Sequence, residues 1–357
     1  MTSQRVEILD VFRGIAILMV VLFHFTARLP PASLNITGMP SPPVFFGWIG
    51  VYFFFAISGY CIFLTLERSA TVSMFLARRF SRIYPAYLAA AILLFLYGLV
   101  AYLPSVPSAE YRVNTPGIID LFINFFFVGE IGEWVNGSFW SIAVEVKFYL
   151  LVALLALLFA DHKKLATVFS WLALILAPLW IIADQAGYLL KGSHDIGKLI
   201  AFLAIAPYLP FFAIGILGRM RMQAKMPTTV LLAANIVMSA VIILLQATAT
   251  AGMGETLTGT ISVLTFLGLM ALFLRFVNGQ ALPHIPVLSP ALAGIGFFSF
   301  SWYLIHENLG ISFLVNLDRY MPAPLAAILA MIATFIIAYA FAQAFEWRFR
   351  KPFEKFA

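Results

Sequence analysis

The chain has 357 residues, of which 62% are hydrophobic and only 11% are charged. A soluble domain carries about 25% charged residues, so the composition excludes a soluble protein and predicts an all-α, polytopic transmembrane bundle. The net charge of +6 is interpreted as loop charge that sets membrane orientation, and no nucleic-acid partner is expected. The single cysteine, Cys61, excludes an intramolecular disulfide and a cysteine metal site, and we expect no bound metal.

About ten apolar runs are long enough to cross a hydrocarbon core of about 30 Å. We expect no separate soluble domain, so residues 1–357 are predicted to form a single membrane domain. The predicted spans are 6–28, 48–66, 82–103, 139–160, 166–186, 198–218, 228–248, 257–275, 293–316 and 323–346.

A shorter apolar segment, 117–135, ends in glycines and glutamates. It predicts either an eleventh span or a re-entrant or interfacial segment. If it does not cross, most of the 22 lysines and arginines lie on the side of both termini. The positive-inside rule then places both termini in the cytoplasm, and we favour this arrangement.

Arg13 and His24 lie inside the first apolar run, where ionisable side chains are costly and indicate function. Helical geometry places them on one face, about 16 Å apart along the axis. Such a stripe fits a helix that lines a tunnel for a long donor molecule. Alternatively, Arg13 pairs with Asp10 three residues earlier, and His24 is a hydrogen-bonded interfacial histidine.

Three arginines, Arg78, Arg79 and Arg82, precede the third predicted span. Guanidinium groups bind phosphate in a bidentate manner and keep their charge, so this cluster predicts contacts to a phosphate-bearing donor. The alternative is ordinary cytosolic loop charge in contact with lipid headgroups.

Glu145 lies a few residues inside the fourth predicted span, at a depth similar to that of His24. A carboxylate at that depth needs a partner, and a carboxylate beside a histidine makes a general base. We therefore predict that His24 and Glu145 are catalytic. The alternative is that Glu145 pairs with Lys147 or is neutral and hydrogen-bonded.

Two further stretches, 136–145 and 299–307, carry polar residues at the edge of or inside apolar spans. The second contains Tyr303, His306 and Glu307. His306 is interpreted either as a substrate contact or second catalytic group, or as a structural histidine. The predicted substrate contacts are Asn136, Ser138, Trp140, Ser141, Tyr303 and His306.

Taken together, these motifs resemble those of the acyltransferase-3 family of bacterial membrane acyltransferases, in order from residue 5 to about residue 350. The segments that carry the resemblance are Arg5–Ala16, Phe53–Tyr60, Arg79–Pro85, Trp140–Tyr149 and Ser299–His306.

The resemblance implies about ten spans in the bacterial inner membrane and transfer of a short acyl group to a sugar hydroxyl of a lipid-linked or exported polysaccharide. The implied donor is acetyl-CoA or another acyl-CoA, a co-substrate rather than a permanently bound cofactor, with contacts at Arg79 and Arg82. It also implies catalytic roles for His24 and Glu145. Some members carry a fused hydrolase-like domain, which we expect this chain to lack.

Two other functional classes stay open on the residues alone. Intramembrane arginine, histidine and glutamate also mark proton-coupled secondary transporters, and a non-enzymatic partner in glycan export is the third class. The sequence shows no repeat symmetry or pair of broken spans of the kind found in many transporters. The acceptor sugar and the oligomeric state are not predicted.

Overall fold

The computed structural model describes residues 3–27, 45–100, 116–187, 205–223, 228–247 and 255–348. Every regular element in these ranges is helical, and none of them contains a strand. This confirms the predicted all-α class. The helices are α1 (Ser3–Thr26), α2 (Ile49–Glu67), α3 (Val72–Val100), α4 (Ile118–Phe125), α5 (Phe139–Leu158), α6 (His162–Gly187), α8 (Leu209–Met222), α9 (Thr229–Ala247), α10 (Glu255–Val277), α11 (Leu288–Phe297), α12 (Ser299–Leu317) and α13 (Ala323–Phe341).

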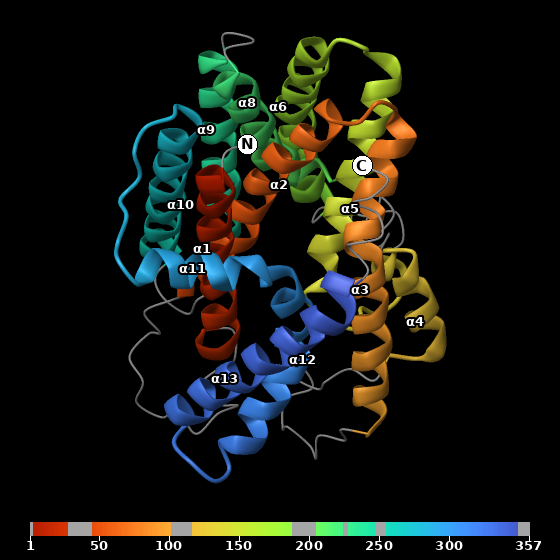
Figure 1. Ribbon diagram of the computed structural model, residues 1–357, viewed down its shortest axis with the longest axis vertical. Coiled ribbons are helices and arrows are strands. Elements are labelled where there is room, and N and C mark those ends of the chain that lie inside the picture. The colour runs from red at the N-terminus through yellow and green to blue at the C-terminus, as the bar shows by residue number, and fades with distance from the viewer. Residues whose placement is uncertain are drawn as a thin grey trace. The chain divides into compact units, whose positions relative to one another are not determined.

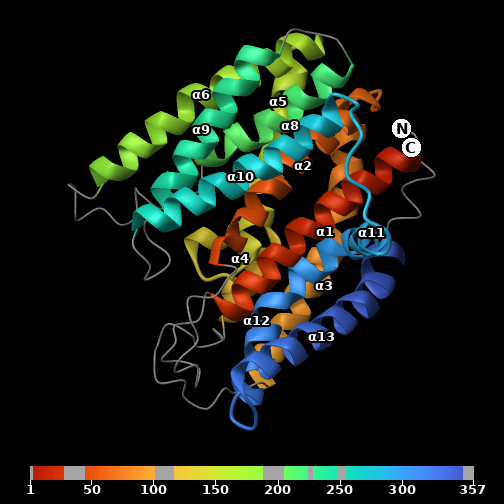
Figure 2. The ribbon, with the colours of Figure 1, turned by 90° about the vertical axis from the view of Figure 1, so that its left-hand side faces the viewer.

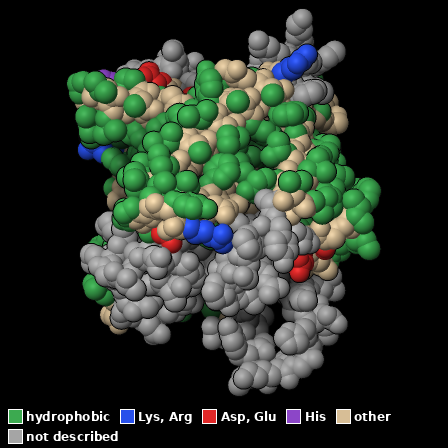
Figure 3. Space-filling model, turned by 90° about the horizontal axis from the view of Figure 1, so that it is seen from below, with side chains coloured by type: hydrophobic (Ala, Val, Ile, Leu, Met, Phe, Trp, Pro, Cys, Tyr) green, Lys and Arg blue, Asp and Glu red, His purple; other side chains and the backbone are tan. Residues whose placement is uncertain are grey.

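Among the described residues, eight helices are long and apolar enough to cross a membrane, and a bent pair, α11 and α12, makes a ninth candidate. Hydrophobic side chains accordingly dominate the coloured surface in Figure 3. The protein is therefore a multi-pass membrane protein. These nine candidates correspond to nine of the predicted spans. Residues 198–204 of the tenth predicted span, 198–218, lie outside the described residues, and the rest of it forms a short turn, η5 (Ala206–Tyr208), and most of the 14-residue α8.

The start of the third span differs from the prediction, whereas segment 117–135 agrees with one of its two predicted forms. Helix α3 begins at Val72, ten residues before the predicted start of the third span, so it carries the arginine cluster as helix. Arginines have good helix propensity, whereas the predicted boundary rested on hydropathy alone. Segment 117–135 forms the eight-residue α4 and a short turn, η4 (Gly129–Ile131). Helix α4 rises only about 12 Å, too short for an eleventh span and consistent with the re-entrant or interfacial prediction.

The chain divides into two compact units. Unit 1 comprises Met1–Gly50, Phe80–Ile142 and Pro290–Ala357, and unit 2 comprises Val51–Arg79 and Ala143–Ser289. In unit 2, α8 packs against α6, α9 and α10, and these helices run side by side in Figure 2. The rings of Phe148 and Phe212 stack there with their centroids 4.0 Å apart.

In unit 1, α12 packs against both α1 and α13, and Figure 1 shows α12 and α13 as a long adjacent pair. The axes of α11 and α12 differ by 75°. At the bend, the carbonyl of Asp10 in α1 occupies the space that a Cβ on Gly296 would need. Near the other end of α1, the ring of Phe25 fills the corresponding space at Gly310 of α12. Glycines thus allow α12 to lie close to the end of α1 that carries His24.

We predict that Gly14→Ala lowers the thermal midpoint of the purified protein. A Cβ at Gly14 would lie 2.9 Å from the carbonyl carbon and 3.2 Å from the Cα of Leu292, both backbone atoms that cannot rotate away. Overpacking of this kind costs about 1–3 kcal/mol. The matched control is Gly294→Ala in α11, where the new methyl group meets nothing within 4 Å. Equal midpoints for the two variants would contradict the close approach of α1 and α11.

Candidate active site

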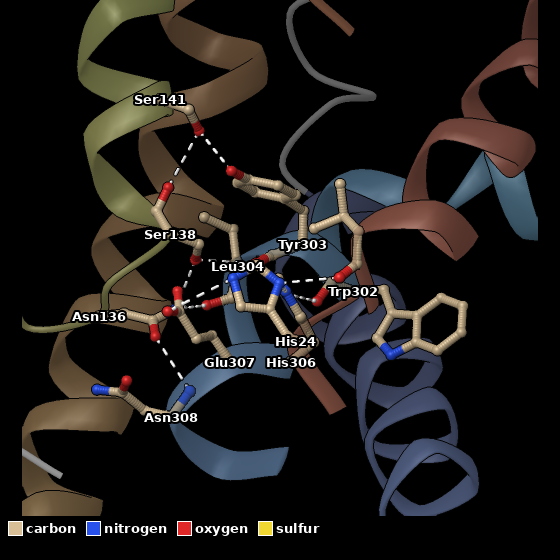
Figure 4. Close-up of polar contacts among 11 residues, drawn as sticks. His24, Asn136, Ser138, Ser141, Trp302, Tyr303, Leu304, His306, Glu307 and Asn308 are labelled. Carbon is tan, nitrogen blue, oxygen red and sulfur yellow. Dashed lines mark hydrogen bonds and ion pairs between the residues drawn. The ribbon is translucent and has the colours of Figure 1, made fainter. Parts of the chain in front are cut away.

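The last turn of α1 presents His24 to the interior of unit 1, where the residue is 7% exposed. Its Nδ1 lies 2.9 Å from the carbonyl oxygen of Val20, one turn earlier in the same helix. The same Nδ1 lies 3.2 Å from Nε2 of His306 in α12. The side chain is therefore held from two directions through one nitrogen. The two imidazoles lie edge to face with their centroids 4.9 Å apart (Figure 4).

His306 is fully buried, and its own helix backbone fixes its other nitrogen. Its Nδ1 lies 2.8 Å from the carbonyl oxygen of Tyr303 and 3.2 Å from that of Trp302. These hydrogen bonds fit the interpretation of His306 as a structural histidine. Its direct contact with His24 also fits the alternative, in which His306 is a second catalytic group.

The carboxylate of Glu307 lies on the other side of the His24 ring. Its Oε1 is 3.6 Å from Nε2 of His24, and the two side chains are only 3% and 9% exposed. This distance is that of an ion pair for a protonated imidazole and an ionised carboxylate. Buried ionisable groups in a membrane helix are costly and mark functional sites, so these three residues form the centre of the candidate site.

A loop that precedes α5 is bound to α12 through the buried amide of Asn136. Its Nδ2 donates to Ser138 Oγ and to the carbonyl oxygen of Leu304, both at 2.8 Å. Its Oδ1 accepts from the backbone N–H of Asn308 at 3.2 Å. The side chain of Asn308 in turn donates to the carbonyl oxygen of Val135 at 2.8 Å. This loop, residues 135–138, is thus fixed beside His306 and Glu307 (Figure 4).

Hydroxyl groups continue the network toward α5. Ser138 Oγ donates to the carbonyl oxygen of Tyr303 at 3.2 Å. Ser141 Oγ donates to the carbonyl oxygen of Ser138 at 3.0 Å and lies 2.6 Å from the Tyr303 hydroxyl. The structure therefore brings five of the six predicted substrate contacts into one connected cluster with His24, and the sixth, Trp140, is half-buried in the first turn of the same helix α5.

Glu145 belongs to unit 2, and its carboxylate is bound within that unit. Its Oε1 accepts hydrogen bonds from Ser58 Oγ at 2.9 Å and from the Tyr149 hydroxyl at 2.7 Å. The predicted pairing of Glu145 with His24 stays a prediction. The carboxylate that lies beside His24 within unit 1 is that of Glu307.

Arg79, also in unit 2, is 8% exposed and donates through Nη2 to Thr65 Oγ1. Its Nε is buried and has no hydrogen-bond partner among the described residues. Arg78 donates to the carbonyl oxygen of Arg68 at 2.8 Å and to Ser69 Oγ at 3.1 Å. Residues 78–79 are thus tied by hydrogen bonds to the end of α2 and the turn that follows it.

The other two predicted donor contacts, Arg82 and Arg13, lie in unit 1. Arg82 is half-buried, and it shares a face of α3 with Arg79 because the two are three residues apart. Arg13 donates to Asp10 Oδ1 at 2.7 Å. The local ion pair that the sequence offered as the alternative for Arg13 is therefore present.

Comparison with known protein families decides the class of protein. The model of the acyltransferase domain of the acyltransferase-3 family matches residues 6–343. The chain belongs to the acyltransferase-3 family. This membership confirms the resemblance drawn from the motifs. It favours an acyltransferase over the secondary transporter and the non-enzymatic export partner.

Individual relatives are more distant. The chain is 29% identical over 189 residues to an O-acetyl transferase of Shigella phage Sf6, covering 49% of this chain and 52% of that protein. It is 27% identical over 203 residues to BcsY of Komagataeibacter xylinus, named as a membrane-bound transacylase, covering 52% and 47%. The chain thus matches only about half the length of these curated relatives. No solved structure gives a significant match.

Within this acyltransferase, Glu307 is the site residue that sequence reasoning did not select. The sequence singled out the apolar span around Glu307. It predicted Glu145 as the carboxylate beside His24, because the two residues are expected at a similar depth in the membrane. Depth alone does not say which helices are neighbours. A carboxylate in an apolar span is itself a functional signal, and it pointed to Glu307 as directly as to Glu145.

We predict that Asn136→Ala destabilises the acyltransferase and lowers its activity. The change removes the hydrogen bonds that the Asn136 side chain makes with Ser138 Oγ, with the carbonyl of Leu304 and with the N–H of Asn308, and each such bond contributes about 0.5–1.5 kcal/mol. Asn316→Ala is the matched control, because among the described residues the Asn316 side chain donates to a single group, a carbonyl one turn earlier in its own helix. Thermal melting in detergent compares the two, and equal stability would contradict a supporting role for the loop.

Proposed function

We propose that this acyltransferase moves an acetyl group, or another short acyl group, from acyl-CoA to a sugar hydroxyl of a lipid-linked or exported polysaccharide. The observation that carries the proposal is the buried cluster of His24, His306 and Glu307 in a membrane acyltransferase. A relative named as an O-acetyl transferase supports oxygen as the acceptor atom.

In the proposed reaction, His24 acts as the general base. It takes the proton of the acceptor hydroxyl while the hydroxyl oxygen attacks the thioester carbonyl. The C–S bond then breaks, and the CoA thiolate receives the proton from His24, so that an O-acyl sugar and free CoA are formed. General-base catalysis of this kind contributes about 10²–10⁴-fold.

Acyl-CoA is a co-substrate in this proposal, and its phosphates meet the arginines of α3. Guanidinium groups suit that task because they bind phosphate through paired hydrogen bonds. Arg79 offers its buried Nε, and Arg82 shares its helix face. Arg78 adds charge at the same helix end, and Arg13 guides the donor further along α1.

The proposed orientation follows the distribution of lysines and arginines. With both termini in the cytoplasm of a bacterial cell, the arginines of α3 lie at the cytosolic face, where acyl-CoA is made. The acceptor then approaches from the outer side, where we propose contacts with Trp140 and with the hydroxyls of Ser141 and Tyr303. Glu145 is retained as a candidate for the catalytic machinery.

The proposal is tested with acetyl-CoA carrying ¹⁴C in the acetyl group, purified protein, and lipid-linked or exported polysaccharide from source cells that lack the gene. Label in the polysaccharide, released as acetate by mild alkali, is expected. Label that stays on the protein would indicate an acyl-enzyme. Binding of acetyl-CoA without transfer would contradict the acceptor class, and absence of binding would contradict the donor.

A further inference from the structure

We infer that Glu307 is the positioning carboxylate of His24, and that His306 with the carbonyl of Val20 determines which nitrogen of His24 receives the proton. The inference rests on the proposed role of His24 as general base. Glu307 thus positions the imidazole of His24, a task distinct from the catalytic role predicted for Glu145.

The proton positions follow from the contacts of His306. Its Nδ1 faces the carbonyl oxygens of Tyr303 and Trp302. Carbonyl oxygens only accept, so Nδ1 carries the proton and donates to them. In the neutral ring the other nitrogen, Nε2, is then an acceptor, and it points at Nδ1 of His24 at 3.2 Å.

The same reasoning fixes the tautomer of His24. Its Nδ1 faces two acceptors, the carbonyl oxygen of Val20 at 2.9 Å and Nε2 of His306. Nδ1 therefore carries a proton in the neutral ring, and the basic lone pair is on Nε2. The acceptor hydroxyl must deliver its proton to Nε2, the nitrogen on the side of Glu307.

Glu307 lies where the positive charge appears. When Nε2 takes the proton, the imidazolium is formed 3.6 Å from Glu307 Oε1, with both side chains more than nine-tenths buried. Opposite charges interact strongly where water is excluded. In the proposed reaction the proton passes from the hydroxyl to His24 and then to the CoA thiolate, and Glu307 takes no part in that transfer. The 3.6 Å separation is an ion-pair distance rather than a short hydrogen bond.

The loop before α5 fixes the carboxylate in this position. A Cβ on Gly137 would lie 2.5 Å from Oε1, 2.8 Å from Cδ and 2.9 Å from Oε2 of Glu307, so the bare backbone of Gly137 forms one wall of the carboxylate site. The two asparagine amides of Asn136 and Asn308 hold that wall to α12. A methyl group at position 137 would displace the flexible carboxylate.

Two substitutions therefore perturb the same contact from opposite sides. Glu307→Gln removes the charge and keeps the shape, and Gly137→Ala keeps the charge and moves it. In both variants we expect kcat for transfer of labelled acetyl to the polysaccharide to fall at least about tenfold, a part of the whole general-base effect. The KM for acetyl-CoA should be unchanged, because donor binding is assigned to the arginines. Glu307→Asp should recover part of the loss.

The spectroscopic measurement is ¹⁵N NMR of histidine-labelled protein, with the His24 signals assigned by comparison with His24→Ala. Glu307→Gln should move the signals of the His24 ring nitrogens, and Glu145→Gln should leave them in place. Wild-type kcat in both Glu307→Gln and Gly137→Ala would overturn the inference, as would His24 signals that respond to Glu145→Gln instead. Retention of activity in His24→Ala would instead contradict the proposed function itself.

Discussion

His24→Ala should reduce kcat by about 10²–10⁴-fold, the contribution of a general base, while acetyl-CoA binds with unchanged affinity. The imidazole is buried against His306 and Glu307 in unit 1, and alanine can neither accept the hydroxyl proton nor return it to the CoA thiolate. A transfer assay at saturating acetyl-CoA measures kcat. Calorimetric titration of the detergent-purified protein with acetyl-CoA measures the affinity.

The matched control is His284→Ala, because His284 is exposed in the segment between α10 and α11. Its kcat and its acetyl-CoA affinity should both equal those of the wild type. Near-normal turnover in His24→Ala would exclude the general-base role. Loss of acetyl-CoA binding in that variant would instead assign His24 to the donor site.

Hydropathy predicted the membrane spans well because each crossing needs its own long apolar run, a local property. It failed where neighbouring helices decide the geometry. The bend between α11 and α12 coincides with a glycine, Gly296, packed against the backbone of α1, a long-range contact that no window along the sequence reports. The early start of α3 was missed because charged residues end an apolar window without ending a helix.

The sequence indicated which residues belong to the candidate site, but it did not indicate which of them contact each other. Arg13 and His24 stood out because charge is rare in apolar spans, and five of the predicted polar residues around α5 and α12 do join His24 in one cluster. The pairing of His24 with a carboxylate depends on which helix lies beside α1. Within unit 1, α12 packs against α1 and brings Glu307 to His24, and the separation of the two helices along the sequence hides this contact.

Arg79→Ala should weaken acetyl-CoA binding about 10–100-fold. A hydrogen bond to a charged group contributes about 1.5–3 kcal/mol, and tenfold in affinity corresponds to about 1.4 kcal/mol. Arg79 is the buried member of the arginine cluster and has an N–H, Nε, without a partner among the described residues. Arg79→Lys should restore little, since an ammonium lacks the planar fork that grips a phosphate. Adding Arg82→Ala should weaken binding further.

Two controls distinguish a phosphate site from general positive charge and from loss of local structure. Arg275→Ala removes an exposed arginine at the end of α10 that donates to the carbonyl of Ala281, and it should bind acetyl-CoA like the wild type. Thr65→Val removes the side-chain partner of Arg79 but keeps its charge, so binding should weaken less than in Arg79→Ala. If Arg275→Ala weakened binding as much as Arg79→Ala, the arginines of α3 would act only as diffuse charge near anionic lipids. If Thr65→Val matched Arg79→Ala, the anchoring of Arg79 to α2, rather than its contact with a phosphate, would account for the effect.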